Sequence, residues 1–97
     1  MEPMSIKNLV CEVMEVFDYT VSKDNSSKAF KSACKSIEQN FPSAKKQKLL
    51  VDVDGSTIQT YTENGKDIDV FDDYDVGAVY IKSEIDLSHI RYLTAPQ

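Results

Sequence analysis

The spacing of apolar residues changes from three or four to two near residue 48, and this change constrains the fold more than any other feature. Before it, apolar residues recur as on one face of an α-helix. After it, they alternate with polar residues, as on a half-buried β-strand. The chain therefore predicts helices first and strands afterwards, an order typical of an α+β domain with helices on one face of an antiparallel sheet.

Two helices are predicted. The first covers residues 5–21, where the apolar stripe is formed by Ile6, Leu9, Val10, Val13, Phe17 and Val21. The second covers residues 27–40, with an apolar face of Phe30, Ala33, Cys34, Ile37 and Phe41 and a solvent stripe of Lys28, Lys31 and Lys35. Asn25, Ser26 or Ser27 can cap its start. Pro42 disfavours helical geometry at Phe41, so the helix ends there and residues 42–48 form a linker.

Two hairpins follow the linker. A two-residue Asp54-Gly55 loop pairs Val51 with Ile58 and turns Leu49, Val51 and Val53 toward the helices. At the second turn, a two-residue Asn64-Gly65 loop would pair Tyr61 with Ile68 and Ile58 with Phe71. A three-residue loop with a bulge at Gly65 instead pairs Thr62 with Ile68 and Thr60 with Val70. The bulged turn is preferred, because it points Val51, Ile58, Ile68 and Val70 to one side of the sheet.

Residues 72–75 are expected to form a loop, and residues 76–82 a fourth strand with Val79 and Ile81 facing inward. Residues 84–93 predict a short terminal helix, because Ser83 and Asp86 resemble a capping box. An edge strand is the alternative, since Ile85 and Leu87 also alternate. The expected fold is one α+β domain over residues 1–97, with two N-terminal helices on one face of a four-stranded antiparallel sheet.

The composition suits one small folded domain. The chain has 97 residues, of which 41% are hydrophobic and 28% charged. A stretch of about 18 apolar residues, which a membrane helix needs, does not occur, and the N-terminus does not read as a signal peptide. Cys11 and Cys34 fall on apolar helix faces, which favours free thiols over a disulfide and hence a reducing, cytoplasmic setting.

Residues 49–57, LLVDVDGST, resemble the first motif of the haloacid-dehalogenase phosphatases. That resemblance implies a nucleophile at Asp52 and a general acid at Asp54. The rest of that family's site needs parallel strands joined by helices, each crossover taking a dozen or more residues. Only 40 residues follow Thr57, and they predict antiparallel hairpins. The hairpin interpretation is therefore preferred, and no catalytic residue is expected.

Metal and cofactor sites are not indicated. An EF-hand starting at Asp52 would have Thr57 where glycine is required. His89 is the only histidine, and the two cysteines lack paired-ligand spacing. No glycine-rich phosphate loop occurs. The expectation is a non-enzymatic protein without metal or cofactor.

The charge is distributed unevenly along the chain. Residues 1–48 carry eight lysines against six acids, a net charge of +2, and residues 49–97 carry ten acids against three basic residues, a net charge of −7. The lysines around residues 28–48 could touch nucleic acid, but the negative second half would oppose it. Such asymmetry points to a partner of opposite charge, although a merely solubilising acidic surface is the alternative.

A partner-binding surface is predicted from these acids and their neighbouring aromatic residues, because aromatic residues supply contact energy while charge steers the encounter. Its members are Asp52, Asp54, Glu63, Asp67, Asp69, Asp72, Asp73, Asp75, Tyr61 and Tyr74. Alternate residues on a strand are about 6.6 Å apart, so rows of carboxylates at this spacing can stand in for a phosphate backbone. Leu50, Phe71 and Tyr80 are expected on the same face, which with an available edge strand also suggests a homodimer.

The acidic segments DVD, DIDVFDDYD and EID resemble, in size and charge placement, the small DNA-mimic inhibitors of phages, of the anti-restriction and anti-CRISPR type. That resemblance implies a stoichiometric inhibitor acting in the host cytoplasm. It would block the basic nucleic-acid-binding site of a nuclease, a restriction or defence component, or a nucleoid protein, without contacting nucleic acid or membrane. Two alternatives remain: an immunity protein or antitoxin that masks a basic toxin, and a housekeeping adaptor domain.

Overall fold

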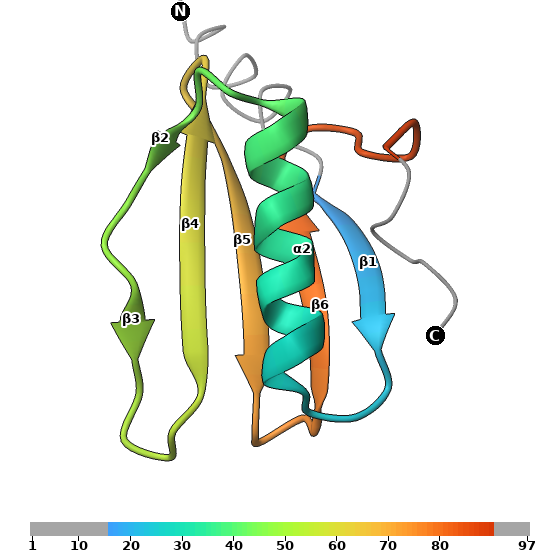
Figure 1. Ribbon diagram of the computed structural model, residues 1–97, viewed down its shortest axis with the longest axis vertical. Helices are drawn as coiled ribbons and strands as arrows, with labels where there is room; N and C mark the ends of the chain where they lie inside the picture. Colours follow the sequence, from blue (N-terminus) through green and yellow to red (C-terminus); the bar gives the residue numbers. More distant parts are fainter. Residues whose placement is uncertain (1–15, 91–97) are drawn as a thin grey trace, which may run out of the picture.

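The computed structural model describes residues 16–90, which form one helix and six strands. In chain order these are β1 (Phe17–Ser22), α2 (Ser27–Asn40), β2 (Lys45–Lys46), β3 (Leu50–Val51), β4 (Thr57–Glu63), β5 (Lys66–Asp73) and β6 (Ala78–Ser83). Figure 1 shows two layers, with α2 packed on one face of the sheet and running along the strands. No helix in the described residues is long and apolar enough to cross a membrane.

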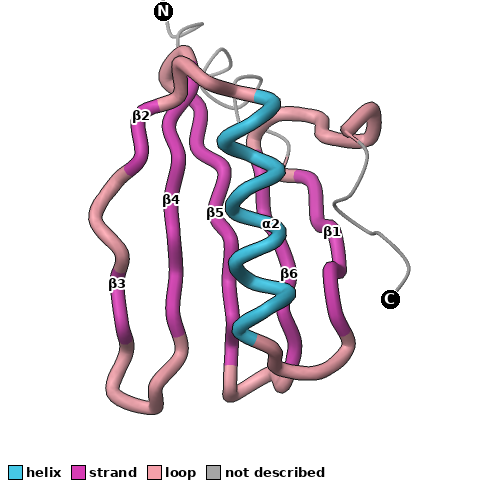
Figure 2. The backbone as a smooth tube through the Cα atoms, viewed as in Figure 1, coloured by secondary structure: helices cyan, strands magenta, loops and turns pink. Residues whose placement is uncertain are grey.

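All strand pairs in the sheet are antiparallel, and the strand order is β1-β6-β5-β4-β2, with β3 also paired to β4. The short strands β2 and β3 therefore share one edge, and β1 forms the other (Figure 2). The α+β character is confirmed. The expected arrangement of two helices on a four-stranded sheet is wrong, because the described residues place one helix on a six-stranded sheet.

The first predicted helix is the main source of this error. Its last residues form β1, and residues 5–15 lie outside the described part of the chain. Phe17 and Val21 fit a helical stripe, but Phe17, Tyr19 and Val21 also alternate with polar residues, as a strand requires. Pairing with β6, where Tyr19 lies opposite Ile81, favours the strand.

The second predicted helix is confirmed at both ends. Ser26 is its N-cap, and its side chain accepts a hydrogen bond from the Ala29 N–H at 3.1 Å. Phe41 follows the last turn, directly before Pro42. Ala33 and Ile37 are buried, and the lysine stripe is exposed, as predicted. The linker prediction for residues 42–48 was incomplete, because Lys45 and Lys46 form the edge strand β2.

The register of the first hairpin differs from the prediction by one residue. Leu50, rather than Val51, lies opposite Ile58, and the Asp52 N–H donates to the Ser56 carbonyl oxygen. The loop thus has three residues and ends at Gly55, whose φ of 91° suits a bulge. Residues Leu49, Val51 and Val53 were expected to face the helices, but their exposed fractions are 44%, 65% and 101%.

The second hairpin has the two-residue Asn64-Gly65 turn rather than the preferred bulged turn. Both residues have positive φ, 54° and 78°, as a type I′ turn requires. Tyr61 therefore lies opposite Ile68, and Ile58 opposite Phe71. The preference for the bulge was wrong because Ile58 does not share a face with Ile68.

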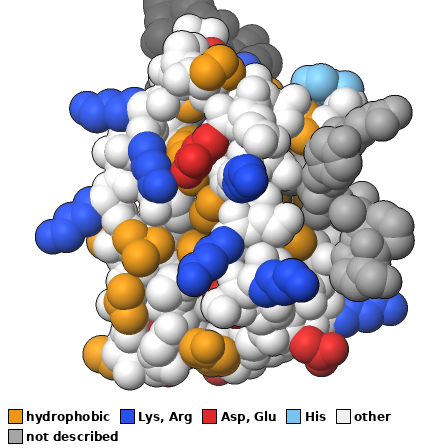
Figure 3. Space-filling view, in the orientation of Figure 1, with side chains coloured by type: hydrophobic (Ala, Val, Ile, Leu, Met, Phe, Trp, Pro, Cys, Tyr) orange, Lys and Arg blue, Asp and Glu red, His pale blue; other side chains and the backbone are white. Residues whose placement is uncertain are grey.

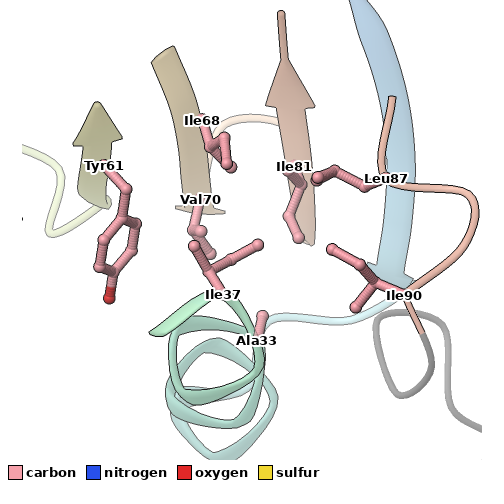
Figure 4. Close-up of a cluster of buried hydrophobic side chains, with 8 residues drawn as sticks. All are labelled: Ala33, Ile37, Tyr61, Ile68, Val70, Ile81, Leu87 and Ile90. Atoms are coloured by element: carbon pink, nitrogen blue, oxygen red, sulfur yellow. The ribbon is translucent and has the colours of Figure 1, made fainter. Parts of the chain in front are cut away.

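The core lies between α2 and the inner face of the sheet. Figure 4 shows Ile37 and Ala33 of the helix directed toward Val70, Ile68 and Ile81 of the sheet. Those five side chains are at most 1% exposed. The inward directions predicted for Ile68, Val70, Val79 and Ile81 are confirmed. Half-buried Cys34 packs against this cluster and makes no disulfide within the described residues, and Cys11 lies outside them.

Two predictions about the later segments are corrected. Asp72 and Asp73 belong to β5 rather than to a loop, and the fourth expected strand begins at Ala78 rather than Val76. Residues 84–90 are neither helix nor strand, and the rest of the predicted terminal element lies outside the described residues. This segment is held by Tyr19, whose hydroxyl accepts a 2.7 Å hydrogen bond from the Leu87 N–H, and Leu87 and Ile90 enter the core.

Candidate protein-binding face

The face of the sheet opposite α2, called here the outer face, carries carboxylates at three of the four alternate positions of β5. Burial alternates along this strand, with Ile68, Val70 and Asp72 buried. Asp67, Asp69 and Asp73 therefore project from the outer face together with Phe71. Successive members of this row are separated by about 6.6 Å, as the sequence predicted for Asp67 and Asp69.

An apolar row crosses the outer face near the β3–β4 and β5–β6 connections. Leu50 lies opposite Ile58, Ile58 opposite Phe71, and Phe71 opposite Tyr80. The rings of Phe71 and Tyr80 stack with a centroid distance of 4.7 Å and an interplanar angle of 11°. Four neighbouring strands thus contribute one side chain each to a continuous apolar row, which lies among carboxylates on both sides.

A hollow lies beside the two middle members of this row, Ile58 and Phe71, on the side of the β3–β4 and β5–β6 connections. Both connections lie at the bottom of the sheet in Figure 1. It has a volume of about 300 Å³. Ile58 and Phe71 give it an apolar lining. Its other lining residues are polar, namely Asp52, Asp54, Ser56, Asp73 and Asp75. Two pairs of carboxylates from separate connections, Asp52 with Asp54 and Asp73 with Asp75, therefore surround one open hollow.

Hydrogen bonds fix several of these carboxylates. Asp73 accepts from the Tyr80 hydroxyl at 2.7 Å and from the backbone N–H groups of Asp75 and Val76. The Tyr80 hydrogen bond is the main cause that lowers the pKa of Asp73 below its usual value, which favours the charged form. Burial, followed by the hydrogen bond to Asp73, raises the pKa of Tyr80 to about 12.

Threonine hydroxyls hold Asp69 and Asp67, the two carboxylates of the β5 row that lie away from the hollow. Thr60 donates to Asp69 at 2.7 Å and Thr62 donates to Asp67 at 2.8 Å. Both hydrogen bonds cross from β4 to β5 on the outer face. They order the carboxylates without neutralising their charge, so the acidic row is preorganised.

The other predicted members of the surface lie elsewhere. Tyr61, expected on the outer face, is 1% exposed and faces α2, and Asp72 is 5% exposed and accepts a hydrogen bond from the Asn25 side chain at 2.8 Å. Glu63 accepts from the Ser43 hydroxyl at the end of β4. Tyr74 is exposed in the β5–β6 turn, where its ring lies beside Gly55. Neither Tyr61 nor Asp72 can belong to an accessible surface.

Sequence reasoning missed Ile58 and Ser56 as parts of this face. Ile58 was assigned to the core because the preferred register placed it with Ile68. The signal that identifies its true position is the Asn64-Gly65 dipeptide, which favours a two-residue turn and hence the pairing of Ile58 with Phe71. Ser56 lies in the hollow and accepts a hydrogen bond from the Tyr74 N–H at 2.8 Å.

The opposite side of the domain is basic. Figure 3 shows lysine side chains gathered over α2 and the neighbouring edge of the sheet. Its members are the exposed residues Lys28, Lys31, Lys35, Lys45, Lys46 and Lys48. Among them, Lys46 pairs with Glu38 at 3.0 Å. The side of α2 is therefore mainly basic and the outer face mainly acidic, with Lys82 opposite Asp69 as a basic residue of the outer face.

The phosphatase-like motif lies on a different scaffold from that of the family it resembles. Asp52 and Asp54 follow β3, a two-residue edge strand that pairs antiparallel with β4. Within residues 16–90, no three carboxylate, imidazole or thiol side chains are grouped as a shared metal ion would require. The two aspartates instead line the hollow of the outer face.

No family model matches the chain, and neither the curated proteins nor the solved structures yield a significant match. Evidence for a function therefore comes from the geometry of the outer face.

Proposed function

We propose that this protein is a small acidic inhibitor of the DNA-mimic type, whose outer face occupies the basic nucleic-acid-binding site of a nuclease or another DNA-binding protein. It acts by stoichiometric competition, in the cytoplasm, without catalysis. The observation that carries the proposal is the combination of ordered carboxylates and a central apolar row on one open sheet face.

The charge pattern supports a protein partner of basic character. Asp67, Asp69 and Asp73 form a row along one strand, and the hollow adds Asp52, Asp54 and Asp75. A row of like charges repels itself, which costs stability. The hydrogen bonds from Thr60, Thr62 and Tyr80 hold this row in place. A surface that served solubility alone would not need carboxylates in fixed positions.

The apolar row supports binding rather than charge display alone. Burial of aromatic and aliphatic side chains supplies contact energy, while the surrounding carboxylates supply orientation and a fast encounter. A DNA-binding cleft offers the complementary surface, because its arginine and lysine side chains can pair with carboxylates and their aliphatic stems can cover apolar residues.

The test starts with capture of the partner from the native host and continues with competition against labelled duplex DNA. The wild-type protein should displace the duplex at one-to-one stoichiometry, and the effect should weaken steeply with added salt. The triple variant Asp67→Asn, Asp69→Asn, Asp73→Asn should lose most of this activity.

A matched control separates the location of charge from the net charge. The variant Ser27→Lys, Ser32→Lys, Gln39→Lys changes the net charge by the same amount on exposed helix positions. It should still displace DNA. Simultaneous binding of DNA and this protein to the captured partner would contradict the proposal. Capture of a toxin without nucleic-acid-binding activity, or of a scaffold, would favour the immunity-protein or adaptor alternative.

A further inference from the structure

The edge strand β3 exposes an unusual run of apolar side chains. The exposed fractions are 44% for Leu49, 56% for Leu50, 65% for Val51 and 101% for Val53. This run lies on the left edge of the sheet in Figure 1, next to the two-residue strand β3. Long exposed apolar side chains at a sheet edge are a surface on which another strand can pair.

The backbone of this edge is also available. In an antiparallel ladder, successive residues direct their N–H and C=O groups alternately toward and away from the neighbouring strand. The Asp52 N–H donates to the Ser56 carbonyl oxygen of the same hairpin at 2.8 Å, so the backbone groups of Asp52 point toward β4. Leu50 is two residues earlier in the same ladder, so its backbone N–H and C=O groups also point toward β4. By alternation, Val51 directs its backbone groups outward, where a further strand would accept and donate. Leu49 precedes the ladder, between the registers of β2 and β3.

We infer that a second copy of this chain pairs antiparallel along β3, with the two-fold axis at Leu50. In this register Val51, whose backbone groups point outward, lies opposite Leu49 of the second copy. Lys48 then lies opposite Asp52 of the second copy. The two-fold axis generates the same pair again, between Asp52 and Lys48 of the second copy. Opposite charges placed directly across an antiparallel pair stabilise it.

Residues 48–52 have a basic residue at one end and an acidic residue at the other, so the segment is complementary to its own antiparallel copy. This favours a second copy of the chain as the partner and fixes the register of the pairing. A slip of one residue would set inward-facing backbone groups against outward-facing ones. A slip of two residues, with the axis at Val51, would place Leu50 opposite Asp52 and so set an apolar residue against a charge. Pairing centred on Leu50 brings the apolar contacts and the opposite charges together in one self-complementary pattern, as an isologous interface requires.

This dimer does not depend on the proposed inhibitor function, but it changes the outer face. Leu50 is the last member of the apolar row, so the two rows meet at the axis and become continuous. The carboxylates of both copies then lie on one extended sheet. Because the paired segment is short, the association should be weak and concentration-dependent.

The inference is tested by sedimentation velocity over a range of protein concentrations. The wild-type chain should shift from monomer to dimer as concentration rises. Lys48→Asp should stay monomeric, since it places two aspartates opposite each other, and Asp52→Lys should stay monomeric because it places two lysines opposite each other. An equimolar mixture of the two variants should form a heterodimer, in which both pairs again have opposite charge.

Two further variants guard against misfolding. Asp52 accepts a hydrogen bond from the Val53 N–H in the turn, so its substitution can perturb the hairpin. Leu50→Lys does not touch that bond, and it should give a folded monomer because two lysines meet at the axis. Asp24→Lys, an exposed site away from the edge, should leave the dimer intact. A monomeric wild-type chain at millimolar concentration, or a dimer that persists in Leu50→Lys, would overturn the inference.

Discussion

The phenol of Tyr80 stacks on the ring of Phe71 and at the same time donates a 2.7 Å hydrogen bond to Asp73. These contacts link β5 and β6 on the outer face and hold a carboxylate beside the hollow. Tyr80 thus links the apolar row to the carboxylates that line the hollow.

Phe71→Ala should destabilise the domain by about 1–3 kcal/mol, because a half-buried ring and its stacking partner are lost. Phe71→Leu should cost less, since part of the apolar contact remains. Urea unfolding followed by circular dichroism measures both. A double-mutant cycle with Tyr80→Leu should show a coupling of about 0.5–1.5 kcal/mol, and strict additivity would argue against a specific ring interaction.

The hydroxyl of Tyr61 donates to Glu38 at 2.6 Å and so fastens α2 to β4. Tyr61→Phe should lower the free energy of unfolding by about 1–2 kcal/mol, because the hydrogen bond has a charged acceptor. Lys46→Gln, which removes the more exposed partner of the same carboxylate, should cost at most about 1 kcal/mol. Equal losses in the two variants would contradict this ranking. Chemical denaturation of each variant provides the comparison.

Stability should decrease in acid. Hydrogen bonds from Tyr61 to Glu38 and from Tyr80 to Asp73 lower the pKa values of these carboxyl groups below the usual 4.5 and 3.8. The folded state then binds fewer protons than the unfolded state, so the stabilisation present above those values is lost as the pH falls through the folded pKa. Unfolding free energies measured across this pH window should fall less steeply in Tyr61→Phe and in Tyr80→Phe.

Stability should also decrease in strong alkali. Burial, reinforced by Asp73, raises the pKa of Tyr80 from 10.0 to about 12. The folded state retains the phenolic proton that the unfolded state releases, so the free energy of unfolding should decline as the pH rises from 10 toward 12. Tyr80→Phe should decline less over this range. Ultraviolet titration of tyrosinate checks the assignment, and a Tyr80 that ionises at pH 10.0 in the folded protein would contradict it.

The two hairpin glycines should respond differently to alanine. Gly65 has φ of 78° and open space around its α-carbon, so Gly65→Ala should cost about 1 kcal/mol through backbone strain alone. Gly55 has φ of 91°, and an added Cβ would lie 3.3 Å from the Tyr74 ring. Gly55→Ala should therefore cost more. The variant Gly55→Ala with Tyr74→Ala should recover the excess, which thermal unfolding can measure.

The parts of the fold that sequence reasoning identified are those whose signals are local. Helix α2 has a capping serine, an apolar stripe and Pro42 within its own segment, and it was predicted correctly. The strand β1 depends instead on pairing with β6, far along the chain, and its residues fit a helical stripe as well. Local periodicity could not decide between a helix and a strand for these residues. Pairing with β6 in the sheet does decide, in favour of the strand.

Both hairpin registers were missed for a common reason. Val51, Ile58, Ile68 and Val70 were assumed to share one face because all are apolar. The outer face in fact has its own apolar row, so apolar character alone did not distinguish the two sides of the sheet. The turn residues did carry the information, since Asn64-Gly65 favours a two-residue loop and Gly55 can close a three-residue loop with a bulge. Asp67 and Asp69 were placed on one side of the strand correctly because their alternation is independent of register. Asp72 and Asp73 were expected in a loop, and Asp72 is buried.

The separation of charge between the lysines over α2 and the carboxylates of the outer face makes the domain an electric dipole across its thickness. A cationic surface exerts a torque on such a molecule before any contact forms. Near such a surface the outer face is turned toward the cationic groups during approach, and the rotational search that limits most protein associations is shortened.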